Sequence, residues 1–301
     1  MTSLQGRLLD RIVPRLNLFG EDGADIPTLR RRIERTAPPV FPWTRVRAEP
    51  VVADGVPGEW VIPKHAADDR AILYLHGGAW VMGSPRTHRA LVADLARRAG
   101  VRALSLDYRL APEHPYPAAL DDGVAAYDWL LARGIEPGRI VVAGDSAGGN
   151  LALALLLRLR DAGTPLPAGA VLLSPVTDLR LSGASHTTRK AVDPFFAKAD
   201  LRAFVELYAG SHDLRDPYLS PLGAELGGLP PLLLHVGDRE VLRDDAVGLG
   251  ERACAAGVEA RTVVWPGMTH VFQVQTFLLP EARRANAEIG AFIRARVGVS
   301  G

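Results

Sequence analysis

Cysteine is almost absent from this sequence of 301 residues. Cys254 stands alone, so the chain has neither an intramolecular disulfide nor a cysteine-based metal site. Neither sign of charge is in excess, because 35 basic and 34 acidic residues leave a formal net charge of +1. Such a chain has no bulk field that attracts phosphate, so we expect neither nucleic acid nor an anionic membrane surface as a partner.

Long apolar runs are missing too. No segment approaches the length of about 18 uncharged apolar residues that a membrane-spanning helix needs. The opening stretch, MTSLQGRLLDRIVPRL, is amphipathic and lacks the apolar run of a signal peptide. We therefore expect a cytoplasmic protein without a membrane span. With 48% hydrophobic and 23% charged residues, the composition is that of a globular protein.

Short β-rich segments recur along the chain, separated by segments of helical length. They are residues 44–52, 58–63, 71–76, 101–107, 139–144, 168–174, 231–237 and 260–265. From the third onward most are almost wholly apolar, which is typical of strands buried on both faces. The first two lie close together and resemble an antiparallel pair. This alternation predicts an α/β fold with a mostly parallel, eight-stranded sheet flanked by helices.

Two stretches interrupt this alternation. Residues 1 to about 43 have a helical pattern and precede the sheet. Residues 176–222 contain a predicted helix, VDPFFAKADLRAFVELYAG, followed by a proline-rich loop. An insertion of that length between strands is usually functional. We expect both stretches to form a helical cap over the ligand-binding end of the sheet, within one domain of residues 1–301. The alternative is that they are ordinary surface helices.

A serine motif lies between a predicted strand and a predicted helix. Residues 144–148 match the pattern G-x-S-x-G, with Ser146 at the centre. In this context a tight turn exposes the serine hydroxyl, and the helix N-terminus adds partial positive charge. The alternative is a glycine-rich turn of purely structural use. No G-x-G-x-x-G follows a strand and no glycine-rich stretch ends in Gly-Lys-Ser/Thr, so we expect no nucleotide.

A second glycine motif, YLHGGAW at 74–80, follows another predicted strand. Gly77 and Gly78 allow backbone N–H groups to point into a cleft, where they and the N–H of Ala147 would bind a developing oxyanion. His76 is expected to orient this loop and not to transfer protons. The alternative is a plain turn that ends the strand.

Eight histidines compete for the role of general base. His270 lies in WPGMTHVFQ, on a loop after the last predicted strand and at the sheet edge expected for Ser146. Most of the others lie in polar loops, inside a strand or at a helix start. The order serine, acid, histidine is the order found in α/β-hydrolases. No spacing of histidine and carboxylate residues suggests a metal site such as H-E-x-x-H.

Several long motifs then occur in the order typical of one family. They are LYLHGGAW, DYRLAPEHPYPAALDD, GDSAGGN, DPYLSPL and GMTHVF. On these motifs, residues 45–297 resemble the hormone-sensitive-lipase-like group of α/β-hydrolases, which are bacterial carboxylesterases with an N-terminal cap. The resemblance implies that Ser146 is the nucleophile and His270 the base. It also implies small esters with short or medium acyl chains as substrates, and no cofactor.

The same resemblance implies that Gly77, Gly78 and Ala147 donate to the oxyanion. One departure is visible in that loop. The family often has H-G-G-G, whereas the third glycine is replaced here by Ala79. A methyl group at this position could narrow the space beside the oxyanion without removing a backbone donor.

The acid of the family is often the first residue of an Asp-Pro-Leu-x-Asp motif. The stretch from Glu240 to Asp244, EVLRD, keeps the leucine and the final aspartate, whereas a match that begins at Asp238 keeps neither. Glu240 is therefore the expected triad acid and Asp238 the alternative. A carboxylate need only accept the histidine Nδ1–H and stabilise the imidazolium. Asp244 is expected to cap the following helix.

These features together predict a serine carboxylesterase that works through an acyl-enzyme intermediate. Two other classes of function stay open. A non-catalytic receptor for a small molecule could use the same fold, since fold does not fix function. An amidase, peptidase or acyltransferase would use the same triad. The sequence also leaves open whether the chain forms a homodimer.

Overall fold

The computed structural model describes residues 3, 5, 6, 12, 23–37, 46–196 and 201–299. One eight-stranded sheet has the order β1-β2-β4-β3-β5-β6-β7-β8. Strand β2 pairs antiparallel with β1 and β4, and every other neighbouring pair is parallel. The strands are β1 (Val46–Ala53), β2 (Val56–Pro63), β3 (Ala67–Leu75), β4 (Val101–Leu106), β5 (Ile140–Asp145), β6 (Gly169–Leu173), β7 (Leu232–Gly237) and β8 (Ala260–Trp265). The predicted α/β fold and its mostly parallel sheet are confirmed.

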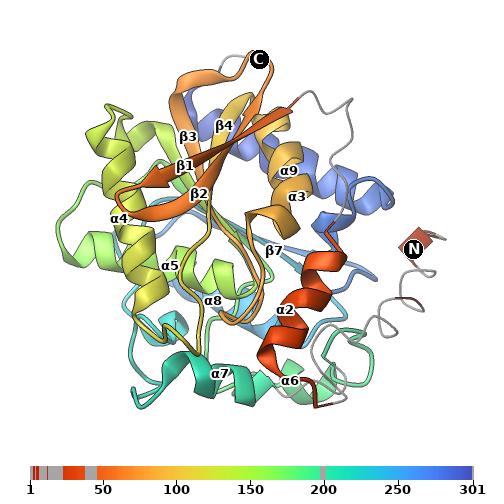
Figure 1. The fold of residues 1–301 in the computed structure, drawn as a ribbon. Helices are drawn as coiled ribbons and strands as arrows, with labels where there is room; N and C mark the ends of the chain where they lie inside the picture. Colours follow the sequence, from red (N-terminus) through yellow and green to blue (C-terminus); the bar gives the residue numbers. More distant parts are fainter. Residues whose placement is uncertain are drawn as a thin grey trace.

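Helices cover both faces of this sheet (Figure 1). Helices α3 and α9 pack on one face, and α4, α5 and α8 pack on the other. The described helices are α2 (Ile26–Arg35), α3 (Pro85–Ala99), α4 (Ala118–Ala132), α5 (Ala147–Asp161), α6 (Ser185–Thr188), α7 (Leu201–Ala209), α8 (Arg243–Ala255), α9 (Pro280–Val297) and the short 3-10 helices η3 (Pro137–Arg139), η4 (Pro221–Gly223) and η5 (Phe272–Gln275). No helix in the described part of the chain is long and apolar enough to cross a membrane.

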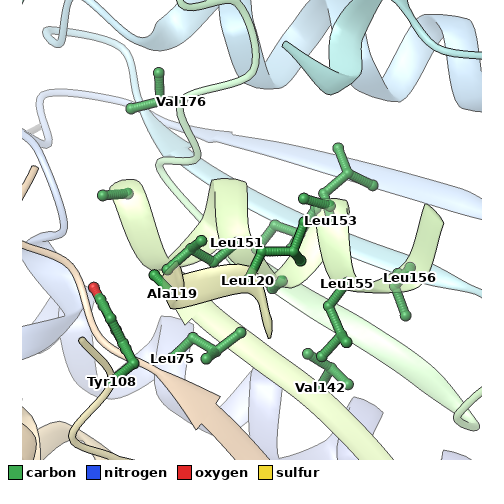
Figure 2. Packing of buried hydrophobic residues seen from close by; sticks show 14 of the residues in the cluster. Leu75, Tyr108, Ala119, Leu120, Val142, Leu151, Leu153, Leu155, Leu156 and Val176 are labelled. Carbon is green, nitrogen blue, oxygen red and sulfur yellow. The ribbon is translucent and has the colours of Figure 1, made fainter. Parts of the chain in front are cut away.

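The central strands are apolar on both sides because each side has its own core. Side chains alternate across a strand, so Leu75 and Val142 point to the face covered by α4 and α5, where Leu155 packs against them (Figure 2). Their neighbours Tyr74 and Val141 point to the face covered by α3 and α9. This two-sided burial explains why these strands form continuous apolar runs in the sequence.

Helix α3 has well-defined ends. Ser84 precedes it, and its side-chain oxygen accepts the N–H of Thr87 while the Thr87 hydroxyl accepts the N–H of Ser84. This reciprocal capping satisfies N–H groups that have no partner inside the helix. The helix ends at Gly100, whose φ of 71° suits glycine. The capped first turn fixes the position of His88, which lies on the face of α3 that is turned to the sheet.

The inserted stretch at 176–222 is less helical than its sequence pattern predicts. Among the described residues of the predicted helix, only α7 is helical. Residues 194–196 form a turn, and residues 197–200 lie outside the described residues. Pro194 disfavours helical geometry at Asp193, whose side chain instead accepts the N–H groups of Phe195 and Phe196. Of the N-terminal stretch, α2 is the largest described piece. Figure 1 shows α2, α6 and α7 at the same end of the molecule.

Candidate active site

Ser146 forms the whole connection between a strand and a helix. Strand β5 ends at Asp145 and α5 begins at Ala147, so Ser146 alone turns the chain, with φ 54° and ψ −120°. A positive φ is strained for a residue with a side chain and persists only where its surroundings enforce it. Here the Ser146 N–H donates to the carbonyl of Leu173 at 2.8 Å, and its carbonyl accepts the N–H of Asn150 at 3.1 Å. The serine is therefore held rigidly at the N-terminus of α5.

The glycines around Ser146 allow the helix to approach the sheet closely. A Cβ atom on Gly144 would lie 2.2 Å from the carbonyl oxygen of Gly148. A Cβ atom on Gly148 would lie 2.0 Å from the carbonyl oxygen of Leu75. Neither backbone atom can move aside cheaply, so this turn requires glycine at both positions. The structural and the functional interpretations of the motif therefore describe the same turn.

His270 and Glu240 form a buried pair. His270 Nδ1 lies 2.8 Å from Glu240 Oε2, and the two residues are 5% and 0% exposed. The other carboxylate oxygen, Oε1, accepts the hydroxyl of Ser174 at 2.8 Å and the N–H of Gly237. Three donors therefore converge on the carboxylate. An acceptor fixed in this way sets the orientation of the imidazole and the position of its Nδ1 proton.

Ser174 is a part of this arrangement that the sequence analysis missed. It directly follows β6, and its hydroxyl also accepts the N–H of Val271 at 3.2 Å, so one side chain joins the acid to the loop of His270. The available signal was a small polar residue at the carboxyl end of a parallel strand, where the sites of α/β sheets lie.

The other acids near this loop are used elsewhere. Asp238 accepts the N–H of Gly267 at 2.7 Å and so supports the turn before His270. Asp244 does not cap α8 as expected. That helix begins at Arg243 and its N-cap is Leu242, so Asp244 already lies within the first turn, and its carboxylate accepts the N–H of Ser185 at 2.8 Å.

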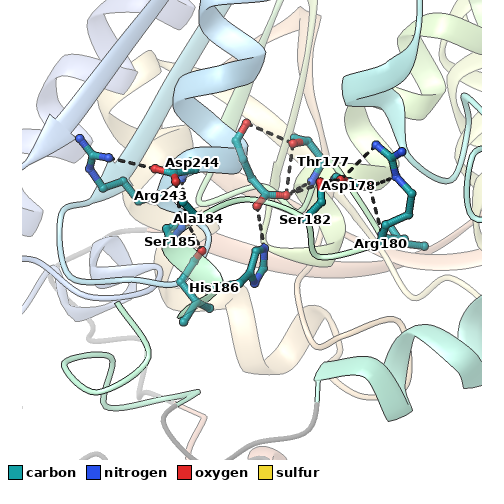
Figure 3. A network of polar contacts seen from close by, with 12 residues as sticks. Thr177, Asp178, Arg180, Ser182, Ala184, Ser185, His186, Arg243 and Asp244 are labelled. Carbon is teal, nitrogen blue, oxygen red and sulfur yellow. Dashed lines mark hydrogen bonds and ion pairs between the residues drawn. The ribbon is translucent and has the colours of Figure 1, made fainter. Parts of the chain in front are cut away.

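Buried carboxylates join the inserted stretch to the start of α8 (Figure 3) and to the loop that precedes it. Asp245 accepts the N–H groups of Thr177 and Asp178 at 2.8 and 3.1 Å, and its second oxygen lies 3.0 Å from His186 Nε2. Asp193 accepts the N–H of Val241 at 2.9 Å. The insertion and the acid loop are thus one hydrogen-bonded unit.

An apolar cavity lies beside Ser146. The empty space in it, with its opening to solvent included, is about 360 Å³. The phenyl ring of Phe196, in this wall, meets the His270 ring edge-on with centroids 4.9 Å apart. The lining residues come from the glycine loop, the serine turn, the inserted stretch with α7 and the turn before α8: Ala79, Trp80, Ser146, Val176, Leu181, Phe196, Leu201, Phe204, Val205 and Leu242. Phe196 thus lines the cavity beside Ser146 and also contacts the ring of His270.

The expected set of oxyanion donors in the glycine loop has to be changed. The N–H of Gly77 donates to Asp145 Oδ1 at 3.0 Å, and a donor paired with a buried carboxylate is not free for a substrate oxygen. Gly77 is therefore not the oxyanion donor that the sequence analysis expected. Within the described residues, no hydrogen bond uses the N–H of Gly78, Ala79 or Ala147. Ala147 is the first residue of α5, whose N–H has no partner within its helix.

Known proteins resemble this chain along most of its length. A family model described as the alpha/beta hydrolase fold matches residues 72–274. An acetyl-hydrolase of Streptomyces hygroscopicus is 51% identical over 240 residues, which cover 80% of this chain and 80% of that protein. An esterase of Acinetobacter venetianus is 41% identical over 249 residues, or 82% of each chain.

A solved structure agrees with these relatives. The crystal structure of an esterase from the bacterial hormone-sensitive lipase family superimposes with a TM-score of 0.95 and 44% identity, covering 99% of this chain and 100% of the other. Sequence and fold thus agree over most of the chain. The protein belongs to the α/β-hydrolase fold family, in its hormone-sensitive-lipase-like group of carboxylic-ester hydrolases.

Proposed function

We propose that the chain hydrolyses carboxylic esters with Ser146 as nucleophile and His270 as general base. The hydroxyl of Ser146 attacks the ester carbonyl as His270 takes its proton, and His270 then gives that proton to the departing alcohol. Water, activated by His270 in the same way, releases the acid from the acyl-enzyme. Glu240 accepts the Nδ1–H of His270 and stabilises the imidazolium. The observation that carries this proposal is the buried 2.8 Å contact between His270 and Glu240.

The oxyanion is bound by the N–H groups of Gly78, Ala79 and Ala147. This set differs from the expected one because the N–H of Gly77 is paired with Asp145. Ala79 takes the place of a glycine, yet its backbone N–H is kept. Donors of this kind act where charge develops in the transition state, in a cavity that excludes water.

The substrates are esters with short or medium acyl chains. The cavity beside Ser146 is apolar and of limited size, which favours a small hydrocarbon chain over a long one. The 51% identical relative described as an acetyl-hydrolase points in the same direction.

A receptor on this fold would have no use for a buried acid–histidine pair beside a strained serine, so catalysis is favoured over binding alone. An amidase, peptidase or acyltransferase would use the same residues, so the substrate decides between these classes.

Turnover of matched substrates tests this proposal. The purified chain should hydrolyse p-nitrophenyl esters, with kcat/KM highest for the shorter acyl groups in a series from acetate to dodecanoate. The matching p-nitroanilides should react far more slowly. Mass spectrometry after rapid quenching should find the acyl group on the peptide that contains Ser146. Equal turnover of the anilides would indicate an amidase, and binding of the esters without turnover would indicate a receptor.

We also propose that α2 and residues 176–222 form a cap within one domain. Helix α2 is attached next to the glycine loop through Arg30, whose guanidinium donates to the carbonyls of Val81 and Ala111 at 2.7 and 2.9 Å. The same side chain binds Glu113 through two hydrogen bonds of 2.8 and 2.7 Å. This attachment supports a role for α2 in closing the apolar cavity.

Removal of residues 1–36 should leave the sheet folded and lower kcat/KM by about tenfold or more, because a displaced loop costs catalysis even when the chemistry is intact. Arg30→Ala should lower it in the same direction. Arg31→Ala is the matched control, since Arg31 is bonded to Thr28 within α2. Circular dichroism checks the fold, and kcat/KM is measured across acyl lengths. A truncated, folded protein with an unchanged acyl-length profile would exclude the cap role.

A further inference from the structure

Asp145, the residue before the serine, has a carboxylate that the mechanism does not use. It ends β5 on the same face as Val141, so it points to the side of the sheet covered by α3. Its Oδ1 accepts the hydroxyl of Tyr74 at 2.6 Å and the N–H of Gly77 at 3.0 Å, while Oδ2 lies 3.2 Å from His88 Nε2. Asp145 is only 2% exposed. A buried carboxylate thus holds the first glycine of the loop.

The contacts around His88 favour its protonated form. Nε2 faces Asp145 Oδ2, which can only accept, so Nε2 carries a proton. Nδ1 lies 2.8 Å from the hydroxyl oxygen of Thr87, and that hydroxyl already donates to the carbonyl of Ser84 at 2.8 Å. While the Thr87 hydroxyl donates to Ser84, its oxygen can accept a proton from Nδ1, which suits a doubly protonated ring. An imidazolium at His88 would donate in both contacts, and the 3.2 Å contact of Nε2 with Asp145 Oδ2 would then be an ion pair.

The electrostatics of the pair agree with this assignment. Burial by itself lowers the pKa of His88, but attraction and hydrogen bonding by Asp145 outweigh it and raise that pKa above its ordinary value. Burial likewise raises the pKa of Asp145, and the opposing effects of His88 and Tyr74 hold that pKa below its ordinary value. Burial lowers the pKa of His76, which is stacked on His88, to about 3, so His76 is neutral.

A lone carboxylate at this position would oppose catalysis. Asp145 is adjacent to Ser146 and bonded to Gly77, so it lies directly behind the groups proposed to receive the oxyanion. Charges of like sign repel strongly where water is excluded, and the repulsion would be felt only in the transition state. The close contact between Asp145 and the loop requires glycine at position 77, because a Cβ atom there would lie 2.3 Å from Asp145 Oδ2.

We propose that Asp145 and His88 act as a charge-compensated pair of positioning residues: Asp145 fixes the oxyanion loop through Gly77, and His88 cancels its negative charge. The inference rests on the proposed esterase function. It assigns a role to the aspartate of the GDSAG stretch and to a histidine on α3 that neither contacts the substrate nor transfers its proton.

Single and double variants separate charge from geometry. His88→Gln keeps a hydrogen-bond donor but leaves Asp145 uncompensated, and kcat should fall about a hundredfold with little change in KM, comparable to the loss of one oxyanion donor. Asp145→Asn together with His88→Gln removes both charges, while the asparagine oxygen still accepts from Tyr74 and Gly77. The double variant should therefore recover most of the lost kcat. A double variant as slow as His88→Gln, or slower, would overturn charge compensation.

A pH profile gives a second readout. Among the described residues, the titratable groups that act on the pair are Tyr74 and His76 from β3 and its loop, Tyr108 after β4 and Glu34 from α2. Because its pKa is raised, His88 keeps its charge to a higher pH than an ordinary histidine and loses it as the pH rises through that value. The kcat of the unmodified enzyme should fall on this alkaline side, and the fall should be absent from the double variant. The same fall in both proteins would contradict the inference.

The charge on His88 can be observed without catalysis. Nitrogen NMR shifts of the histidines, assigned with His88→Gln, should show both His88 nitrogens protonated at pH 7. A protein that hydrolyses no ester but retains this imidazolium would refute the proposed function and leave the ion pair standing. A neutral His88 in an active esterase would refute the inference and leave the function standing.

Discussion

Ser146→Ala is expected to lower kcat for ester hydrolysis by about a millionfold, the size of effect found when a triad nucleophile is removed. The alanine has no atom that can attack the carbonyl, so no acyl-enzyme can form. His270, Glu240 and the oxyanion amides stay in place, and the residual rate reflects their binding of the transition state alone. Turnover of a p-nitrophenyl ester by the purified variant, against a buffer blank, measures this loss.

Two checks make the result specific. Alanine must adopt the φ of 54° that Ser146 adopts, and since both side chains carry a Cβ atom the strain is nearly unchanged, so thermal unfolding should shift little. Ser105→Ala is a matched control, because Ser105 is also buried but its hydroxyl has no hydrogen-bond partner among the described residues. That control should keep its activity. Hydrolysis by Ser146→Ala at even a tenth of the original rate would rule out the serine mechanism.

The sheet could be predicted from the sequence because its signal is local. Each central strand is a short apolar run, and two-sided burial makes such runs continuous. The predicted extent of the helix at residues 192–210 was wrong, and the reason is again local. Pro194 and the side chain of Asp193 compete with helical hydrogen bonding at its start, so only Leu201–Ala209 is helical among the described residues of that stretch.

The oxyanion loop shows what a sequence pattern does not contain. The motif indicates which residues have mobile backbone N–H groups, but not which of those groups already have a partner. The partner of Gly77 is Asp145, 68 positions away, and the contact arises only because β3 and β5 are neighbours in the sheet. Ser174 was missed for the same reason, since its partner Glu240 is 66 positions away.

A comparison of two variants tests which residue is the acid of the triad. Glu240→Gln should lower kcat about ten-thousandfold, the effect of neutralising such an acid. The structure gives the reason: Ser174 and Gly237 both donate to Oε1, so the oxygen of the new amide should stay with them. Its NH₂ group then faces His270 Nδ1. A donor at this place selects the tautomer with the proton on Nε2, and that nitrogen can no longer accept the proton of Ser146.

Asp238→Asn is the matched control for this prediction. The asparagine oxygen can still accept the N–H of Gly267, so the turn before His270 should keep its shape. The expected loss is tenfold or less, roughly the cost of a small disturbance next to a catalytic group. Both variants should remain folded, and kcat of the two purified proteins is compared on one ester. A severe loss in Asp238→Asn beside near-normal Glu240→Gln would assign the triad acid to Asp238, and the 2.8 Å contact of Glu240 would then be structural only.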